Sequence, residues 1–321
     1  MQTLNPLVLV TNRFDPHLRF KLPQMKHARF VYVDDLFASD SQLDQAQGII
    51  IRSSTHVDDR LLKVAKNLKF VITGTSGFDH LNLETLKERS VRCFHIPESQ
   101  SVAAAELTLL MILATARKFS LSQEQLKKGD WQRSLLLGRQ IAGQQLGLVG
   151  LGRVGQQVAV RAQALGMVVC AFDPYLESVV PGVTMLGFEE LMRSSDVISL
   201  HVPKTKKTRH MIKKETLSWM DTDACLINMS RGDVVNEPDL IAHLQGHPDF
   251  RAGLDVFAKE PLDASSVLLK MSNVVATPHI GASTKEALRE SSAKSVELAE
   301  ALILGQNVSG ELPPKESWFS D

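Results

Sequence analysis

The sequence has little of what marks secreted, membrane-bound or nucleic-acid-binding proteins. Among its 321 residues, 36 basic side chains balance 36 acidic ones, so the formal net charge is zero. A neutral chain gives no electrostatic basis for binding nucleic acid or an anionic membrane. The cysteines are few, scattered and odd in number, and they lie in apolar contexts: Cys93, Cys170 and Cys225. This pattern favours small buried thiols in a reducing compartment.

Targeting and membrane-spanning signals are also missing from the sequence. Residues 1–6 contain no basic group, and the apolar run at 7–10 is too short for a signal peptide. The longest apolar stretch, at 107–114, lies between Glu106 and Arg117 and is far below the ~20 residues of a membrane-spanning helix. We therefore expect a cytoplasmic protein without membrane or nucleic-acid partners. No cluster of metal-ligating residues stands out, and we expect no metal.

The chain alternates expected strands and helices from end to end. Its length and its 44% hydrophobic content allow a core for each of two domains. Expected strands lie at residues 7–10, 29–33, 48–51, 68–73, 91–95, 146–149, 167–172, 197–200, 224–228, 253–257 and 274–277. Expected helices lie at residues 57–65, 83–89, 101–118, 156–165, 188–193, 214–219, 237–245 and 284–304. The tail at 310–314 is expected to be loose.

A glycine-rich loop at residues 150–155 joins an apolar run to a helix-like segment, and the next apolar run ends on Asp173. Gly150 permits the tight turn, Gly152 lets the backbone approach a pyrophosphate, and Gly155 lets helix and strand pack closely. Asp173 follows Gly150 by 23 residues, where a carboxylate accepts hydrogen bonds from the ribose hydroxyls of NAD and repels the 2′-phosphate of NADP. The alternative is an ordinary strand–helix–strand crossover whose glycines serve only the turn.

The order of elements predicts an α/β fold with two doubly wound parallel-sheet, Rossmann-like domains and an active-site cleft between them. Residues 102–282 are expected to form the NAD-binding domain. Residues 1–101 together with 283–321 are expected to form a flavodoxin-like, substrate-binding domain, to which the last helix returns.

Three charged or titratable side chains follow successive expected strands of the glycine-loop domain: Arg231, Glu260 and His279. Loops after parallel strands gather at one edge of the sheet, the edge that holds the cofactor. Taken singly, each of these residues is as well explained without a function, as a surface charge or as a polar group with its hydrogen bonds satisfied. Together they suit hydride transfer to or from a 2-hydroxy acid: a guanidinium holds the substrate carboxylate, a histidine exchanges the hydroxyl proton, and a carboxylate orients the histidine.

These motifs resemble the D-isomer-specific 2-hydroxyacid dehydrogenases from about residue 48 to residue 304. The resemblance implies that Arg231 binds and polarises the substrate, that His279 is the acid/base and that Glu260 supports it. It also implies contacts of Asp255 with the nicotinamide carboxamide and of Asp173 with the adenosine ribose. The implied cofactor-binding residues are Gly150, Gly152, Arg153, Val154, Gly155, Asp173, His201, Pro203, Thr208, Met229, Ser230, Asp255 and Gly281. The loop at 74–79 matches the family's substrate loop, with Ser76 and Gly77 as contacts. A homodimer formed through the NAD domain, with an arm at 129–143, is implied as well.

The substrate depends on how Arg52-Ser53-Ser54-Thr55 is interpreted. A guanidinium and hydroxyls at a strand end make a phosphate site, in which Arg52 and Ser53 bind substrate. The alternative is a helix entry, with Ser54 or Thr55 as the cap and Arg52 in solvent. The segment resembles D-3-phosphoglycerate dehydrogenases, the enzymes that lead into serine biosynthesis, although Thr73 replaces an arginine there.

Two further functions stay open. One is a reductase of glyoxylate, hydroxypyruvate or another 2-oxo acid, which has no need of Arg52. The other, from a different class, is an NAD-linked binding protein similar to the C-terminal-binding-protein corepressors, although the chain shows no basic region of the kind a nucleic-acid-directed protein carries.

Overall fold

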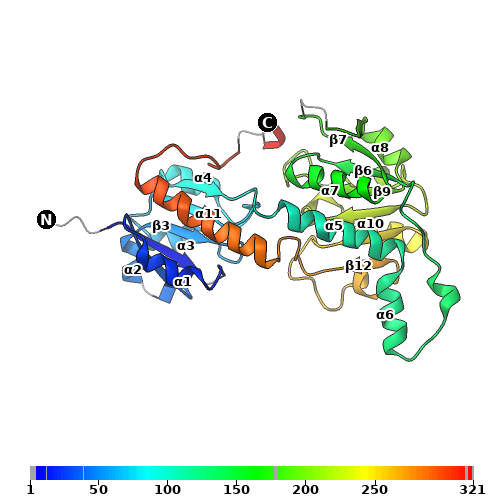
Figure 1. The fold of residues 1–321 in the computed structure, drawn as a ribbon, viewed down its shortest axis with the longest axis horizontal. Helices are drawn as coiled ribbons and strands as arrows, with labels where there is room; N and C mark the ends of the chain where they lie inside the picture. Colours follow the sequence, from blue (N-terminus) through cyan, green and yellow to red (C-terminus); the bar gives the residue numbers. More distant parts are fainter. Residues whose placement is uncertain (1–4, 12, 39, 177–179, 315–316, 320–321) are drawn as a thin grey trace. The chain divides into compact units, whose positions relative to one another are not determined.

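The computed structural model describes residues 5–11, 13–38, 40–176, 180–314 and 317–319. The chain folds into two compact units (Figure 1). Unit 1 contains Met1–Gln100 and Ser283–Asp321, and unit 2 contains Ser101–Ala282. The chain therefore leaves unit 1 once and returns to it through the last helix, α11 (Lys285–Ile303).

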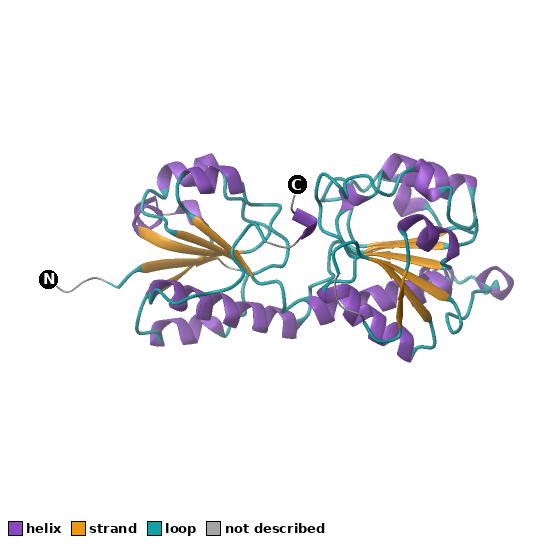
Figure 2. Ribbon diagram, turned by 90° about the horizontal axis from the view of Figure 1, so that it is seen from above, coloured by secondary structure: helices purple, strands orange, loops and turns teal. Residues whose placement is uncertain are grey.

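Unit 1 is built on a parallel sheet of five strands in the order β2-β1-β3-β4-β5. The strands are β1 (Leu7–Thr11), β2 (Arg29–Val33), β3 (Ala46–Ile51), β4 (Phe70–Thr73) and β5 (Arg92–His95). The helices are α1 (Leu18–Lys21), α2 (Asp40–Gln45), α3 (Asp59–Val64), α4 (Leu83–Glu88) and α11, with short 3₁₀ turns η1 (Leu22–Gln24), η2 (Leu36–Ala38) and η6 (Ser317–Phe319). Helices cover both faces of the sheet (Figure 2).

Strand β3 shows why this sheet is buried on both faces. Ile49 and Ile51 point into one hydrophobic cluster and Ile50 into the other, and all three side chains are fully buried. Successive side chains of a strand point to opposite faces, so a continuous apolar run fits a sheet that is covered on both sides.

The C-terminal tail is not loose, and that expectation was wrong. The N–H of His95 donates to the carbonyl of Gly310 (2.9 Å), and the N–H of Leu312 donates to the carbonyl of Cys93 (2.8 Å). Leu312 is buried in the core of unit 1. The tail therefore lies antiparallel along β5, where Phe94 pairs with Glu311, and it covers what would otherwise be an open sheet edge.

Unit 2 is built on a parallel sheet of seven strands in the order β12-β11-β10-β9-β6-β7-β8. The strands are β6 (Gln145–Val149), β7 (Val168–Phe172), β8 (Val183–Met185), β9 (Val197–Leu200), β10 (Cys225–Asn228), β11 (Arg251–Leu254) and β12 (Val274–Ala276). The helices are α5 (Ser101–Ala116), α6 (Phe119–Lys127), α7 (Arg153–Ala164), α8 (Phe188–Ser194), α9 (Lys214–Leu217) and α10 (Glu237–Gly246), with 3₁₀ turns η3 (Arg133–Leu136), η4 (Gly232–Val234) and η5 (Val267–Lys270).

The helix expected at 101–118 is confirmed as α5, which ends at Ala116, and a further helix, α6, follows it from Phe119. Lys118 takes a left-handed conformation with φ of 49°, which ends α5 and begins α6. Helix α5 packs with α7 over a core that includes Met111, Leu148 and Val158. The fold is α/β with two parallel sheets. No helix among the described residues is both long and apolar enough to cross a membrane.

Candidate active site

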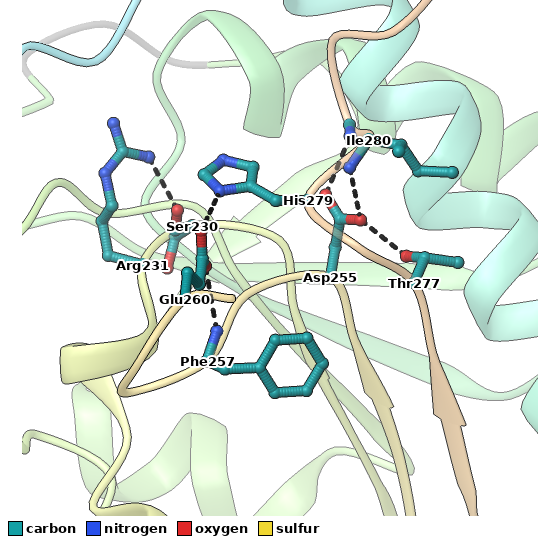
Figure 3. A network of polar contacts seen from close by, with 9 residues as sticks. Ser230, Arg231, Asp255, Phe257, Glu260, Thr277, His279 and Ile280 are labelled. Atoms are coloured by element: carbon teal, nitrogen blue, oxygen red, sulfur yellow. Dashed lines mark hydrogen bonds and ion pairs between the residues drawn. The ribbon is translucent and has the colours of Figure 1, made fainter. Parts of the chain in front are cut away.

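Three neighbouring strands of unit 2 carry the predicted catalytic residues in the loops that follow them. Strands β10, β11 and β12 lie side by side and run parallel. Arg231 follows β10, Glu260 follows β11 and His279 follows β12. Figure 3 shows the His279 ring pointing at Glu260, with the Arg231 side chain on the same side of the loops. The structure thus brings together three residues that lie far apart in the sequence.

His279 and Glu260 form a hydrogen-bonded pair. Nδ1 of His279 lies 2.6 Å from Oε2 of Glu260, whose other oxygen accepts the N–H of Phe257 (3.1 Å). The Glu260 hydrogen bond raises the pKa of His279 above its usual value and outweighs the opposing effects of burial and of the Arg231 charge. Burial by itself raises the pKa of Glu260, but the hydrogen bond and charge of His279, with smaller effects of Phe257 and Arg231, bring it below its usual value.

The loop that carries Arg231 is fixed by a buried asparagine. Oδ1 of Asn228 accepts both the N–H and the hydroxyl of Ser230, and Nδ2 donates to the carbonyl of Arg231 (3.0 Å). Nη1 of Arg231 donates to the carbonyl of Ser230 (2.7 Å). Gly232 is required at its position, because a Cβ there would lie 1.9 Å from the carbonyl oxygen of Phe257. The loops after β10 and β11 therefore lie close together at this point, where only a glycine fits.

Asp255 holds the loop that carries His279. Its carboxylate is buried and accepts the hydroxyl of Thr277 (2.6 Å) and the N–H groups of Ile280 (2.8 Å) and Gly281 (2.8 Å). The N–H of His279 donates to the carbonyl of Asp255 (2.8 Å). Figure 3 shows this second network beside the His279–Glu260 pair. The backbone of the histidine loop is therefore fixed independently of the imidazole.

The glycine loop between β6 and α7 has the space and backbone geometry that a pyrophosphate needs. Gly150 has φ of 94°, and a Cβ there would lie 2.8 Å from the carbonyl oxygen of His201. A Cβ on Gly155 would lie 2.3 Å from the carbonyl oxygen of Gly150. Around Gly152, in contrast, a Cβ would meet no atom within 4 Å, so the N-terminal end of α7 faces open space. An anion at that place is stabilised by the helix dipole and its first N–H groups.

The other predicted adenosine-side residues lie near this loop. Asp173 directly follows β7 and accepts the N–H groups of Leu151 (2.9 Å) and Tyr175 (3.1 Å). Burial lowers the pKa of His201 to about 4, so the ring is neutral, with Nε2 on Ser199 and a buried Nδ1 that has no partner among the described residues. Thr208 donates to the carbonyl of Pro203 (2.6 Å). Of the other cofactor-binding candidates, Val154 and Met229 pack against the core.

Arg52, Ser53, Ser76 and Gly77 belong to unit 1. Arg52 is half-buried, and its Nη1 donates to the carbonyl of Gly74 (3.2 Å) and to the hydroxyl of Ser291 (3.1 Å). Burial, and then the nearby charge of Arg13, lower the pKa of Arg52. Ser53 is exposed at the first turn after β3.

The helix-entry interpretation of this segment was wrong. Helix α3 begins at Asp59, and its cap is Asp58, which accepts the N–H of Leu61 (3.0 Å). Residues 52–55 instead form a turn, closed by the N–H of Thr55 on the carbonyl of Arg52 (2.9 Å). Neither Ser54 nor Thr55 caps a helix, and Arg52 is not in solvent.

Sequence reasoning missed one residue that supports the loop at 74–79. Gln100 is buried, accepts the N–H of Ser76 (3.1 Å) and donates to the carbonyl of Gly74 (3.2 Å). Gln100 follows the loop by more than 20 residues, and no periodic pattern or motif links the two. The signal that could have found it is the strand order: Gln100 follows β5, which pairs with β4, and the loop at 74–79 follows β4.

Comparisons with known proteins identify the family of this chain. A family model described as D-isomer specific 2-hydroxyacid dehydrogenase, NAD binding domain, matches residues 109–281. The chain is 37% identical over 257 residues to a hydroxypyruvate reductase of Thermotoga maritima, an alignment that covers 79% of this chain and 83% of the relative. The chain belongs to the D-isomer specific 2-hydroxyacid dehydrogenase family. It is an NAD-dependent enzyme of that family, as expected from the glycine loop and the Arg231, Glu260 and His279 constellation.

Other members of the dehydrogenase family differ in substrate and length. A D-3-phosphoglycerate dehydrogenase of Archaeoglobus fulgidus is 37% identical over 251 residues, which is 77% of this chain and 47% of the relative. The chain spans about half the length of the phosphoglycerate dehydrogenases it matches. The crystal structure of D-lactate dehydrogenase from Aquifex aeolicus, complexed with NAD and lactic acid, has a TM-score of 0.81 and 31% identity over 93% of this chain and 96% of that one. These relatives leave the 2-hydroxy acid open.

Proposed function

We propose that Arg231, Glu260 and His279 carry out hydride transfer chemistry on a D-2-hydroxy acid or its 2-oxo counterpart. The observation that carries this assignment is the 2.6 Å bond between His279 and Glu260 at strand ends beside Arg231. Because Nδ1–H donates to the carboxylate, Nε2 is the nitrogen that exchanges a proton with the substrate oxygen at C2. The planar guanidinium of Arg231 suits the substrate carboxylate, to which it can donate two parallel hydrogen bonds.

The residues around the glycine loop fit NAD. The open space at Gly152 leaves room for the pyrophosphate at the start of α7, and Arg153 and Val154 begin that helix. Asp173 is the acceptor for the adenosine ribose. The unpartnered Nδ1 of His201 is a buried polar atom that a ligand group would satisfy. When bound, NAD supplies or accepts the hydride. The chain's own groups position the substrate and hold the proton on His279.

For the substrate, we propose D-3-phosphoglycerate, which would place the enzyme in serine biosynthesis. Arg52 supports this choice: it is half-buried, it lies near Arg13, and no carboxylate pairs with it among the described residues. A partly desolvated guanidinium beside a second one is stabilised by an anion, and a phosphate matches its geometry. Ser53, exposed in the same turn, is the hydroxyl that would join it.

Hydroxypyruvate is the second candidate, because the Thermotoga maritima relative is named for it and matches this chain over most of its own length. The test is NADH oxidation with 3-phosphohydroxypyruvate, hydroxypyruvate and glyoxylate, using the wild type, Arg52→Ala and the control Arg60→Ala. We expect the phosphorylated substrate to be preferred, and the preference to be lost in Arg52→Ala alone. Equal turnover of the unphosphorylated acids by the wild type would assign Arg52 a structural role and the enzyme to general 2-oxo acid reduction.

We also propose a homodimer formed through the NAD-binding unit. The segment at 129–143 exposes Trp131 (77%) and Leu137 (81%), and large exposed apolar side chains in one segment favour a protein contact. Sedimentation should give a dimer for the wild type and a monomer for Leu137→Asp. Three free, buried cysteines fit the proposed cytoplasmic location.

A further inference from the structure

Phe319, in the 3₁₀ turn η6, contacts the loop at 74–79. The ring of Phe319 lies against the ring of Phe78, with centroids 5.4 Å apart. The edge of the His95 ring meets Phe78 as well, at 5.7 Å and an interplanar angle of 85°. Phe78 is therefore held between the end of β5 and the end of the chain.

The segment that carries Phe319 is itself anchored on β5. In addition to the backbone bonds of His95 and Leu312, the guanidinium of Arg92 donates two hydrogen bonds of 2.8 Å to the carboxylate of Glu311. Leu312 packs in the core of unit 1. Backbone pairing, an ion pair and a buried side chain thus set the register of residues 310–312 on β5.

The two halves of the loop are held differently. The first half is fixed by polar bonds: Ser76 donates its N–H to Gln100, and its carbonyl lies 2.8 Å from Nδ1 of His95. In the second half, the carbonyl of Gly77 accepts the hydroxyl of Thr75 (2.7 Å) and the carbonyl of Phe78 accepts the N–H of Leu81 (3.0 Å), whereas the N–H of Gly77 donates to no acceptor among the described residues. The side chain of Phe78 is held by its ring contacts.

We propose that Phe319 is a positioning residue for the loop at 74–79 and that it acts through Phe78. The inference rests on the proposed function and on the substrate contacts expected of Ser76 and Gly77. His95 links the two parts, since its N–H binds the tail and its ring binds the loop. Loss of the Phe319 ring removes one of the two ring contacts that hold the Phe78 side chain.

The kinetic test compares Phe319→Ala with Phe319→Tyr, which keeps the ring. The matched control is Phe20→Ala, a phenylalanine of the same unit that is 75% exposed. In Phe319→Ala the KM for the 2-oxo acid should rise by about 2- to 12-fold, the size of one aromatic pair contact. The kcat and the Kd for NADH should stay at their wild-type values, and Phe319→Tyr should restore the KM. A general structural defect would lower kcat and weaken NADH binding together.

Hydrogen exchange of the loop gives a readout that needs no turnover. The amides of residues 76–79 should exchange faster in Phe319→Ala than in the wild type or in Phe20→Ala. Unchanged exchange would overturn the positioning role, whatever the activity. Faster exchange with an unchanged KM in an active enzyme would overturn the link to substrate. If the wild type reduces no 2-oxo acid, the proposed function fails, and the exchange data still decide whether Phe319 holds the loop.

Discussion

Replacement of Glu260 by glutamine tests the proposed acid/base pair most directly. The 2.6 Å bond to Nδ1 raises the pKa of His279, so the imidazolium that donates a proton during reduction persists to a higher pH than in an isolated histidine. Reduction should therefore fall as the pH rises through this raised pKa. The amide introduced by Glu260→Gln keeps an acceptor oxygen for Nδ1–H but carries no charge, so the fall should move to lower pH.

The structure sets the size of the effect. A hydrogen bond to a charged group contributes about 1.5–3 kcal/mol. The His279 and Glu260 side chains are 48% and 35% exposed, so solvent screens the pair and the lower end applies. About 1.5 kcal/mol corresponds to about a tenfold loss of the protonated form on the alkaline side of the profile, with recovery toward the wild-type rate in acid.

The assay is kcat/KM for NADH-dependent reduction between about pH 5 and 9.5 at constant ionic strength. His279→Asn is the reference variant: its kcat should fall by about 10²- to 10⁴-fold and its pH limb should vanish, while NADH still binds. Oxidation needs the neutral ring, so in Glu260→Gln the rate of oxidation should hold up to a lower pH than in the wild type. A Glu260→Gln profile that superimposes on the wild type would refute the assignment of Glu260 as the partner that tunes His279.

Three further predictions concern the cofactor, the loop packing and the pH dependence of stability. Asp173→Asn keeps an acceptor for backbone N–H groups but removes the charge, so the ratio of kcat/KM for NADH over NADPH should fall; an unchanged ratio would remove Asp173 from cofactor selection. Gly232→Ala should cost about 1–3 kcal/mol in urea unfolding and most of the activity, because its Cβ would overlap the carbonyl of Phe257; wild-type stability would contradict that geometry. Burial, and then the charge of His247, lower the pKa of His243 to about 4. The neutral ring therefore contributes stability above the usual histidine pKa, and this stability should be lost as the pH falls toward 4. Urea unfolding at several pH values should show a smaller loss in His243→Asn.

The parts of this site that could be predicted from the sequence are those set by strand ends. Arg231, Glu260 and His279 each follow an apolar run, and parallel strands bring their C-terminal ends to one edge, so convergence follows from topology alone. The glycine loop could be predicted as well, because it follows a strand end and its glycines are sterically required. A Cβ on Gly150 or Gly155 would meet backbone atoms at 2.8 and 2.3 Å.

Contacts made by side chains across long sequence separations could not be predicted. Gln100 reaches back to Ser76, and Phe319 reaches Phe78, without any periodicity that relates them. The short helix α3 shows a related limit: Ser54, Thr55 and Asp58 all have side chains that can cap a helix, and Asp58 is the cap. The intervening Val57 pairs with the distant segment at Leu81, a contact that the sequence pattern does not indicate.

The backbone of His279 shows why a whole network, and not the histidine alone, makes the site. His279 has φ of 53°, a left-handed conformation that costs a residue with a Cβ about 1–2 kcal/mol. Three N–H groups of its loop offset that cost by donating to Asp255: His279 to the carbonyl, and Ile280 and Gly281 to the carboxylate. Because Asp255 fixes the backbone, Glu260 has only to orient the ring. The turn of the chain and the protonation of the imidazole are thus controlled by two different acids, so a substitution at one should change activity in a way that a substitution at the other does not reproduce.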